Sequence, residues 1–263
     1  MTPAHATSRR PMRIARPLAA VTAAAAIAAA APPPDRPTVY LVGDSTMAER
    51  VDTSKTLERG WGQMFGRFLD RDVTVRNVAR NGRSTKSFRA EGRWDSVMTQ
   101  VRPGDYVLIE FGHNDEKVTD SARFTNPYTG FRRNLARFAA EARAKGATPV
   151  LLTPIARRHF NARGVLEDTH GAYALAVREV ARDERVPLID LQLLTEDLIA
   201  AAGPEGSKAL FVWVAPGGSP IYPEGHQDDT HLDAAGAVAV ARLAAQALKA
   251  SGLPLARHVV GVE

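Results

Sequence analysis

The sequence predicts an α/β fold built on a parallel β-sheet with helices on both faces. Short apolar runs rich in β-branched residues alternate with longer amphipathic stretches along most of the 263 residues. The expected strands are nearly continuous apolar runs, which is the pattern of strands buried on both faces. Regular alternation of such strands with helices is typical of a parallel sheet covered on both sides.

Five strands are expected in chain order. They are Thr38–Val42, Val73–Val78, Tyr106–Phe111, Pro149–Thr153 and Pro187–Leu191. Apolar residues at helical spacing predict helices at Gly62–Leu69, Trp94–Gln100, Thr129–Lys145, His170–Asp183 and Thr195–Ala202. A last helix in LDAAGAVAVARLAAQALKASG ends at Gly252, ahead of Pro254. Residues 204–230, rich in Gly and Pro, are expected to form a long loop.

The first 31 residues have the composition of an export signal. A basic region precedes an alanine-rich apolar run from about Pro17 to Ala31, which is followed by prolines. The run is shorter than the roughly 20 residues of a membrane-spanning helix, and alanine is only mildly apolar. We therefore expect cleavage near Ala29–Ala31, a secreted or periplasmic protein, and no membrane attachment after cleavage.

Four segments follow: an export signal at 1–31, a proline-rich linker at 32–37, one domain at 38–255 and a C-terminal tail at 256–263. The signal holds four arginines and no carboxylate, so the formal charge of +5 falls to about +1 beyond it, from 30 basic and 29 acidic residues. A nucleic-acid partner thereby loses its main support. The chain has no cysteine, which excludes disulfides and thiolate chemistry.

Gly43-Asp44-Ser45-Thr46 directly follows the first expected strand. A turn with a helix cap is the simpler interpretation, because Asp, Ser and Thr satisfy free backbone N–H groups. The other is a nucleophilic serine, which needs a base at neutral pH.

DDTHLDAAGA, before the last helix, offers that base. Asp228 and His231 are three residues apart, and on a turn they would lie on the same side, where a carboxylate can orient the imidazole. Asp229 competes with Asp228 for this role. Alternatively, Asp229, Thr230 and Asp233 only cap the helix.

Donors for a tetrahedral oxyanion are expected at two further strand ends. Gly82, in NVARNGRSTKSF, would let a backbone N–H approach a substrate closely. Asn114, in EFGHND, carries a neutral amide. Because the carboxyl ends of parallel strands lie at one edge of the sheet, we expect Ser45, Gly82 and Asn114 to converge there.

This ordered series of motifs resembles the SGNH (GDSL-like) hydrolase superfamily. GDSTMA, GWGQMF, FGHND, TPVLLTPIARR and DDTHLDAAGA further resemble the rhamnogalacturonan acetylesterase family of carbohydrate esterases, over residues 38 to about 245. The resemblance implies Ser45 as nucleophile, His231 as base and Asp228 as its orienting partner. It implies an oxyanion hole formed by the Ser45 backbone N–H, Gly82 and Asn114. It also implies a flavodoxin-like three-layer α/β/α sandwich with a five-stranded parallel sheet, and no cofactor or metal.

The expected reaction is hydrolysis of O-acetyl esters on plant cell-wall polysaccharide, with rhamnogalacturonan as the first choice of substrate. Acetylated xylan or a small acetylated sugar would suit the same chemistry. Six basic residues near the expected site either attract galacturonate carboxylates or are solvated surface groups. They are Arg80, Arg83, Lys86, Arg89, Arg157 and Arg158.

Four other classes of protein compete with this hypothesis. GWGQMFG has one residue too many for a dinucleotide-binding motif. HND and HQDDTH could ligate a metal, but the chain lacks His-Glu-x-x-His. Residues 43–47 read GDSTM and do not form the Gly-x-Ser-x-Gly elbow of α/β-hydrolases. A non-catalytic carbohydrate-binding protein is the remaining alternative, which an assay with p-nitrophenyl acetate would distinguish.

Overall fold

The computed structural model of this chain describes residues 1–2 and 36–263. The expected export signal, from residue 3 onward, and the linker up to residue 35 lie outside the described residues. Among the helices of the described part, none combines the length and the apolar character needed to cross a membrane.

Five parallel strands form the central sheet, as the sequence predicts. They are β1 (Thr38–Gly43), β2 (Thr74–Asn77), β3 (Tyr106–Glu110), β4 (Thr148–Leu152) and β5 (Leu188–Ile189). Their order is β2-β1-β3-β4-β5, with every neighbouring pair parallel. This is the flavodoxin-like order, in which the direction of chain progression reverses between β1 and β3. Ligands in such sheets bind outside the carboxyl ends of the strands at that reversal.

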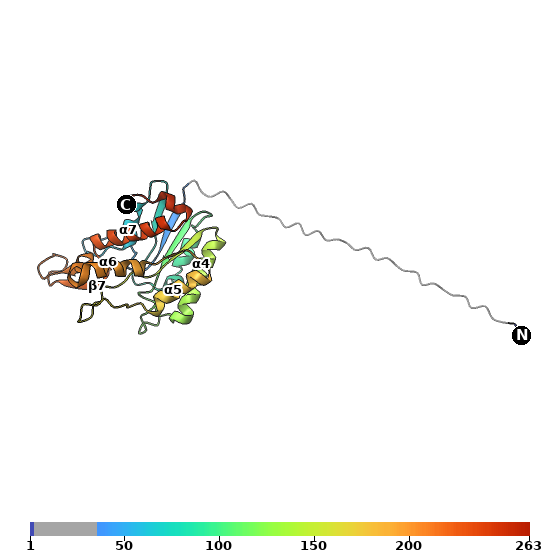
Figure 1. The fold of residues 1–263 in the computed structure, drawn as a ribbon, viewed down its shortest axis with the longest axis horizontal. Coiled ribbons are helices and arrows are strands. Elements are labelled where there is room, and N and C mark those ends of the chain that lie inside the picture. Colours follow the sequence, from blue (N-terminus) through green and yellow to red (C-terminus); the bar gives the residue numbers. More distant parts are fainter. Residues whose placement is uncertain (3–35) are drawn as a thin grey trace. The chain divides into compact units, whose positions relative to one another are not determined.

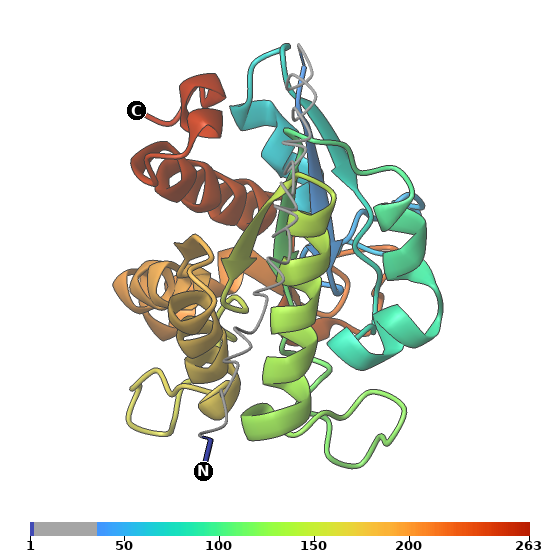
Figure 2. The ribbon, with the colours of Figure 1, turned by 90° about the vertical axis from the view of Figure 1, so that its right-hand side faces the viewer.

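Helices cover both faces of the sheet, which confirms the predicted three layers (Figures 1 and 2). Val39 and Leu41 of β1 pack toward α1 (Trp61–Phe65), α6 (Leu191–Gly206) and α7 (Ala234–Ala250). Tyr40 and Val42 point the other way, because successive side chains of a strand alternate in direction. On that face lie α2 (Thr85–Ala90), α3 (Arg93–Met98), α4 (Arg132–Ala144) and α5 (Ala172–Asp183).

Short helical turns complete these elements. They are η1 (Gly66–Phe68), η2 (Pro127–Phe131), η3 (Ser207–Leu210) and η4 (Pro254–His258). The short helix α2 is absent from the prediction, although Ser84 and Ser87 form a reciprocal capping box at its start. The predicted strand Pro187–Leu191 is too long, because the Asp190 side chain accepts the N–H of Leu193 and begins α6.

The prediction of a long loop at 204–230 is wrong. The helix α6 continues past a break at Gly203, where φ is +70°, and η3 follows it. An antiparallel pair, β6 (Phe211–Val214) and β7 (His226–Leu232), then occupies much of the segment. The run FVWV has the β-branched and aromatic composition of a strand, which the surrounding Gly and Pro residues obscured.

The C-terminal segment predicted as a tail packs against the domain. Val259 and Val262 are buried in the core that includes α7, and Val259 forms a β-bridge with Leu69. The backbone N–H of Asp70 donates to the carbonyl of His258 at 2.9 Å. The packed domain therefore extends beyond residue 255.

Candidate active site

Ser45 lies in a tight turn at the carboxyl end of β1. A Cβ atom on Gly43 would come within 2.7 Å of the carbonyl oxygen of Glu110 on β3, so glycine lets the two strands run close together there. The buried Asp44 side chain accepts hydrogen bonds from the backbone N–H and the hydroxyl of Thr46, both at 3.0 Å. Asp44 and Thr46 thus stabilise the turn, and the Ser45 hydroxyl is left to other partners.

His231 is that partner, across 186 positions of the chain. Its Nε2 atom lies 3.0 Å from the Ser45 hydroxyl oxygen, and its Nδ1 atom lies 2.7 Å from Oδ2 of Asp228. Because an ionised carboxylate only accepts hydrogen bonds, Nδ1 carries the proton and Nε2 presents its lone pair to Ser45. The structure therefore brings together the three side chains that the sequence singles out.

Asp228 and His231 meet on an irregular part of β7. Trp213 pairs with Gln227 and Phe211 pairs with Leu232, so four residues of β7 stand opposite Val212 alone. This is a large irregularity in the pairing of the two strands, and such bulges commonly redirect side chains beside active sites. Within it, Oδ1 of Asp228 accepts the backbone N–H groups of Thr230 and His231, both at 2.8 Å. The predicted turn geometry thus occurs within a strand.

Asp229, the competing carboxylate, bonds elsewhere. Its Oδ1 atom accepts from Arg158 Nη1 at 2.6 Å and from the Trp213 indole N–H at 2.8 Å. Asp229 therefore ties β7 to β6 and to the segment that follows β4. Geometry favours Asp228 as the partner of His231.

The electrostatics of the Asp228–His231 pair favour an ionised Asp228 carboxylate and a more basic His231 imidazole. Burial opposes ionisation of Asp228, but its hydrogen bonds and the His231 charge outweigh this and lower its pKa to about 2. Burial also opposes a charged His231, yet the Asp228 hydrogen bond and charge raise the pKa of His231. Glu58 adds to this rise, since its Oε1 atom lies 3.9 Å from His231 Nδ1.

Arg50 joins three parts of the site. Its guanidinium donates to Oε2 of Glu58 (Nε at 2.9 Å), to the Ser45 carbonyl (Nη2 at 3.3 Å) and to the side chain of Asn81. The residue is only 6% exposed. Neither Arg50 nor Glu58 is singled out by the sequence, because no motif or regular spacing relates them to Ser45.

The predicted oxyanion donors lie in loops that are bonded to one another. Gly82 has a φ of +72°, a left-handed conformation that favours glycine. Asn114 accepts from Arg123 through Oδ1 at 3.3 Å, which fixes its amide orientation, and donates from Nδ2 to the Arg83 carbonyl at 3.2 Å. One amide hydrogen of Asn114 remains, and the backbone N–H groups of Ser45 and Gly82 bond to no other described residue.

A buried carboxyl group connects the elements that surround the site. Glu110, at the end of β3, accepts the Trp61 indole N–H at 2.7 Å and the Ile155 backbone N–H at 3.1 Å. Burial raises the pKa of Glu110 to about 8, and the neighbouring charge of Asp44 adds to the rise. Trp61 and Ile155 belong to α1 and to the segment after β4, so Glu110 links three elements around the turn that holds Ser45.

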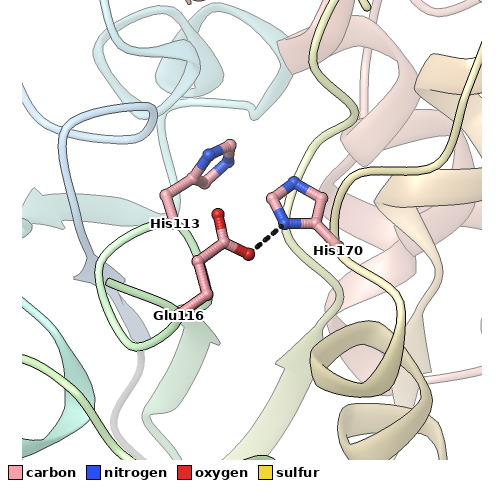
Figure 3. A group of neighbouring side chains, drawn as sticks. All are labelled: His113, Glu116 and His170. Atoms are coloured by element: carbon pink, nitrogen blue, oxygen red, sulfur yellow. Dashed lines mark hydrogen bonds and ion pairs between the residues drawn. The ribbon is translucent and has the colours of Figure 1, made fainter. Parts of the chain in front are cut away.

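A second histidine group consists of His113, Glu116 and His170 (Figure 3). His170 contacts Glu116 Oε2 through Nδ1 at 3.1 Å and the Ile155 carbonyl through Nε2 at 2.9 Å. Both partners are acceptors, so both bonds form when each ring nitrogen carries a proton. The sequence offers no carboxylate at an orienting spacing for His170, because Glu116 is 54 positions away.

His113 completes this group. Its ring meets that of His170 edge to face, with centroids 4.5 Å apart. Neither ring nitrogen has a hydrogen-bond partner among the described residues, and burial lowers the pKa of His113 well below its usual value. The side chain is therefore a neutral imidazole within a polar cluster.

Within residues 1–2 and 36–263, two sets of side chains have donors close enough to hold a metal ion. They are His113, Glu116 and His170, and Glu58, Asp228 and His231, with ligand atoms within 4.8 Å of one another in each set. In both sets, ion pairs already occupy the carboxylates. Arg157 pairs with Glu116 and Arg50 pairs with Glu58.

The chain is similar in sequence to a family of known proteins. The GDSL-like Lipase/Acylhydrolase family model matches residues 41–239. The rhamnogalacturonan acetylesterase RhgT of Bacillus subtilis (strain 168) is 44% identical over 225 residues, which cover 86% of this chain and 95% of that protein. The rhamnogalacturonan acetylesterase of Emericella nidulans is 27% identical over 83% of this chain and 87% of that protein.

Solved structures agree on the fold. The crystal structure of YxiM from Bacillus subtilis superposes with a TM-score of 0.71 at 29% identity, over 83% of this chain and 58% of that one. The acetylxylan esterase Axe2 of Geobacillus stearothermophilus shares the fold with a TM-score of 0.58 at 16% identity, over 83% of this chain and 95% of that one. The resemblance seen in the sequence motifs is confirmed, and the chain belongs to the GDSL-like lipase/acylhydrolase family of carboxylic ester hydrolases.

Proposed function

We propose that this ester hydrolase, a carbohydrate acetylesterase by its relatives, removes O-acetyl groups from the rhamnogalacturonan of plant cell walls. The observation that carries the proposal is the chain of hydrogen bonds from Asp228 through His231 to Ser45 at the carboxyl edge of the sheet. RhgT, which is named for this substrate, aligns over 95% of its own length and supports the choice of polysaccharide.

The first half of the reaction forms an acetyl-enzyme. The Ser45 oxygen attacks the acetyl carbonyl carbon while its proton moves to Nε2 of His231, and the Asp228 carboxylate stabilises the resulting imidazolium. The carbonyl oxygen becomes an oxyanion. The backbone N–H groups of Ser45 and Gly82 and the remaining amide hydrogen of Asn114 are the donors available to it. Collapse of this tetrahedral intermediate completes the acetyl-enzyme: the bond between the carbonyl carbon and the sugar oxygen breaks, and Nε2 of His231 returns its proton to the sugar oxygen.

The second half of the reaction releases acetate. A water molecule then loses a proton to His231 and attacks the acetyl-enzyme. Collapse of the second tetrahedral intermediate frees acetate, and the Ser45 hydroxyl regains its proton from His231. No electron is transferred, so no redox partner is required.

The proposal includes export. A polysaccharide substrate of this size lies outside the cell, and the basic, alanine-rich segment at 1–31 has the composition of a signal peptide. Expression of the full chain followed by mass spectrometry of the culture medium tests this. A mature chain beginning near residue 32 is expected, and uncleaved protein retained in the cytoplasm would contradict it.

Acetate release from acetylated rhamnogalacturonan, acetylated xylan and acetylated glucomannan, measured side by side, tests the substrate. Rhamnogalacturonan should give the highest kcat/KM, and a preference for xylan would move the enzyme to the alternative substrate class. Ser45→Ala is the catalytic blank, with kcat expected to fall about 10⁴-fold or more. Failure of the wild-type protein to cleave p-nitrophenyl acetate would favour a carbohydrate-binding protein instead.

A further inference from the structure

We infer that the groove beside Ser45 is a subsite for a uronate, a sugar that carries a carboxylate, and that Arg80 is its charged contact. This inference rests on the proposed function. It concerns a sugar next to the acetylated one, and so a determinant of substrate choice rather than of the chemical step.

The groove has a volume of about 550 Å³ and lies between two segments that belong to the site. One wall comes from the residues after Ser45, and the other from the loop that leads to Gly82. The residues that line it are Ala48–Asp52, Lys55, Thr56, Asn77, Ala79–Asn81 and Arg83. A substrate with its acetyl group at Ser45 would therefore have room for a neighbouring sugar in this groove.

The groove is positively charged. Arg50, Lys55, Arg80 and Arg83 line it, against two carboxylates, Glu49 and Asp52. Three of the four cations are committed to ion pairs: Arg50 with Glu58, Lys55 with Asp52, and Arg83 with Glu91. The fourth, Arg80, is therefore available to bind an anion that is not part of the chain.

The six basic residues noted from the sequence also differ in whether their side chains already have a partner within the chain. Arg83, Arg89, Arg157 and Arg158 each pair with a carboxylate, and Lys86 donates to the Ser121 carbonyl. The Arg80 side chain is exposed and makes no hydrogen bond or ion pair with any residue that the structure describes. Among the six, the structure therefore favours Arg80 for ligand binding.

The position of Arg80 is set by the backbone of the site. Its N–H donates to the carbonyl of Gly43 at 2.9 Å, two residues before Ser45. The next residue, Asn81, is held by Arg50, and Gly82 follows it. The base of the arginine is thus anchored at the carboxyl end of β1, while its guanidinium is free to form a bidentate pair with a carboxylate.

The test compares two forms of one substrate. An acetylated rhamnogalacturonan oligosaccharide is assayed for acetate release beside the same oligosaccharide with its uronates methyl-esterified, which removes the charge and leaves the acetyl group. The ratio of the two kcat/KM values should be about ten for the wild-type enzyme, the size of one charge-assisted contact in a solvated groove. Arg80→Gln should bring the ratio close to one, and Arg80→Lys should retain part of it.

Arg133→Gln is the matched control, because Arg133 is an exposed arginine on α4 that has no side-chain partner within the described part of the chain. It should keep the wild-type ratio. In the wild-type enzyme, the ratio should also fall as salt is raised, because screening weakens an exposed ion pair. This measurement needs no variant.

Two outcomes would overturn the subsite: a ratio that Arg80→Gln leaves unchanged, whether or not activity falls equally on both substrates, or a wild-type ratio that salt does not alter. Release of acetate from neither substrate would instead contradict the proposed function, and the subsite with it. The two failures are therefore distinguishable.

Discussion

His231 Nδ1 lies 2.7 Å from a carboxylate oxygen of Asp228, whereas the nearest oxygen of Glu58 lies 3.9 Å from the same nitrogen. The shorter distance is a hydrogen bond, and the longer one leaves only a charge interaction. Asp228 therefore sets the orientation and tautomer of the imidazole, and Glu58 shifts its basicity without holding it. The roles of the acidic residues around His231 can be separated by experiment.

Substitution of the two adjacent aspartates should affect different properties: activity for Asp228 and stability for Asp229. Asp228→Asn is expected to lower kcat by roughly 10³- to 10⁴-fold, less than His231→Ala, because the imidazole loses its orienting charge. Asp229→Asn should stay within about tenfold of wild-type activity but lower the melting temperature, since Arg158, which is 7% exposed, loses its ion pair. Kinetics and thermal unfolding of both variants check this, and the reverse pattern would assign the orienting role to Asp229.

The pH dependence of kcat/KM should report the raised pKa of His231. In the proposed mechanism, His231 acts as a base only when it is neutral. The rate should therefore rise with pH, and the acidic limb should lie above the ordinary histidine value of about 6.5. Asp228→Asn removes the negative charge that raises the pKa of His231 most strongly, whereas the burial that lowers this pKa remains. The acidic limb should therefore move to lower pH. Profiles with p-nitrophenyl acetate between about pH 5 and 9 measure both. A limb that stays in place in the variant would mean that another group controls it.

The sequence is informative about this site where strand order alone determines position. In a parallel sheet, residues after successive strands must lie at one edge, so Ser45, Gly82 and Asn114 can be placed together from their motifs. The contact of His231 with Ser45 does not follow from strand order, because it requires the segment before α7 to fold back across the sheet edge. The 3.0 Å separation of the two side chains agrees with the predicted contact.

Other parts of the site depend on packing that no local pattern encodes. Arg50 and Glu58 lie in an irregular segment whose path is determined by contacts such as that of Ala48 with Gly60, where a Cβ atom would approach a carbonyl oxygen to 2.2 Å. Glu116 and His170 come from different connections of the sheet. The β6–β7 pair was missed because the Gly and Pro residues of its connection dominate the composition of the whole segment.

Arg50 should position the site rather than take part in the chemical step. Arg50→Gln removes the bonds to Ser45, Asn81 and Glu58 together, and kcat is expected to fall about 10²-fold through misplacement of the nucleophile and the oxyanion loop. Its positive charge also lowers the pKa of His231, so its loss should move the acidic limb to higher pH. A merely structural defect would lower activity without moving the limb.

Arg182→Gln provides the control for Arg50, because Arg182 forms an exposed ion pair with its neighbour Asp183. It should leave both kcat and the pH profile unchanged. A downward shift of the limb in Arg50→Gln would contradict the charge argument even if the activity were lost.

Glu110 should make the stability of the domain depend on pH. Its folded-state pKa of about 8 lies above the ordinary value of 4.5, so folding favours the protonated form. This contribution to the free energy of unfolding is complete below about pH 4.5 and is lost as the pH rises through about 8. Glu110→Gln cannot titrate. Its unfolding free energy should therefore decline less steeply than that of the wild type between pH 5 and 9.

The slope, rather than the level, is the decisive quantity for Glu110→Gln. The glutamine amide would face the N–H of either Trp61 or Ile155, so the variant should be less stable than the wild type at low pH, where Glu110 is protonated. Denaturant unfolding at pH 5, 7 and 9 gives both quantities, and the exposed Glu184→Gln serves as a control that should keep the wild-type slope. Parallel profiles for Glu110→Gln and the wild type would mean that Glu110 is ionised throughout this range, held as an anion by its hydrogen-bond donors despite its burial.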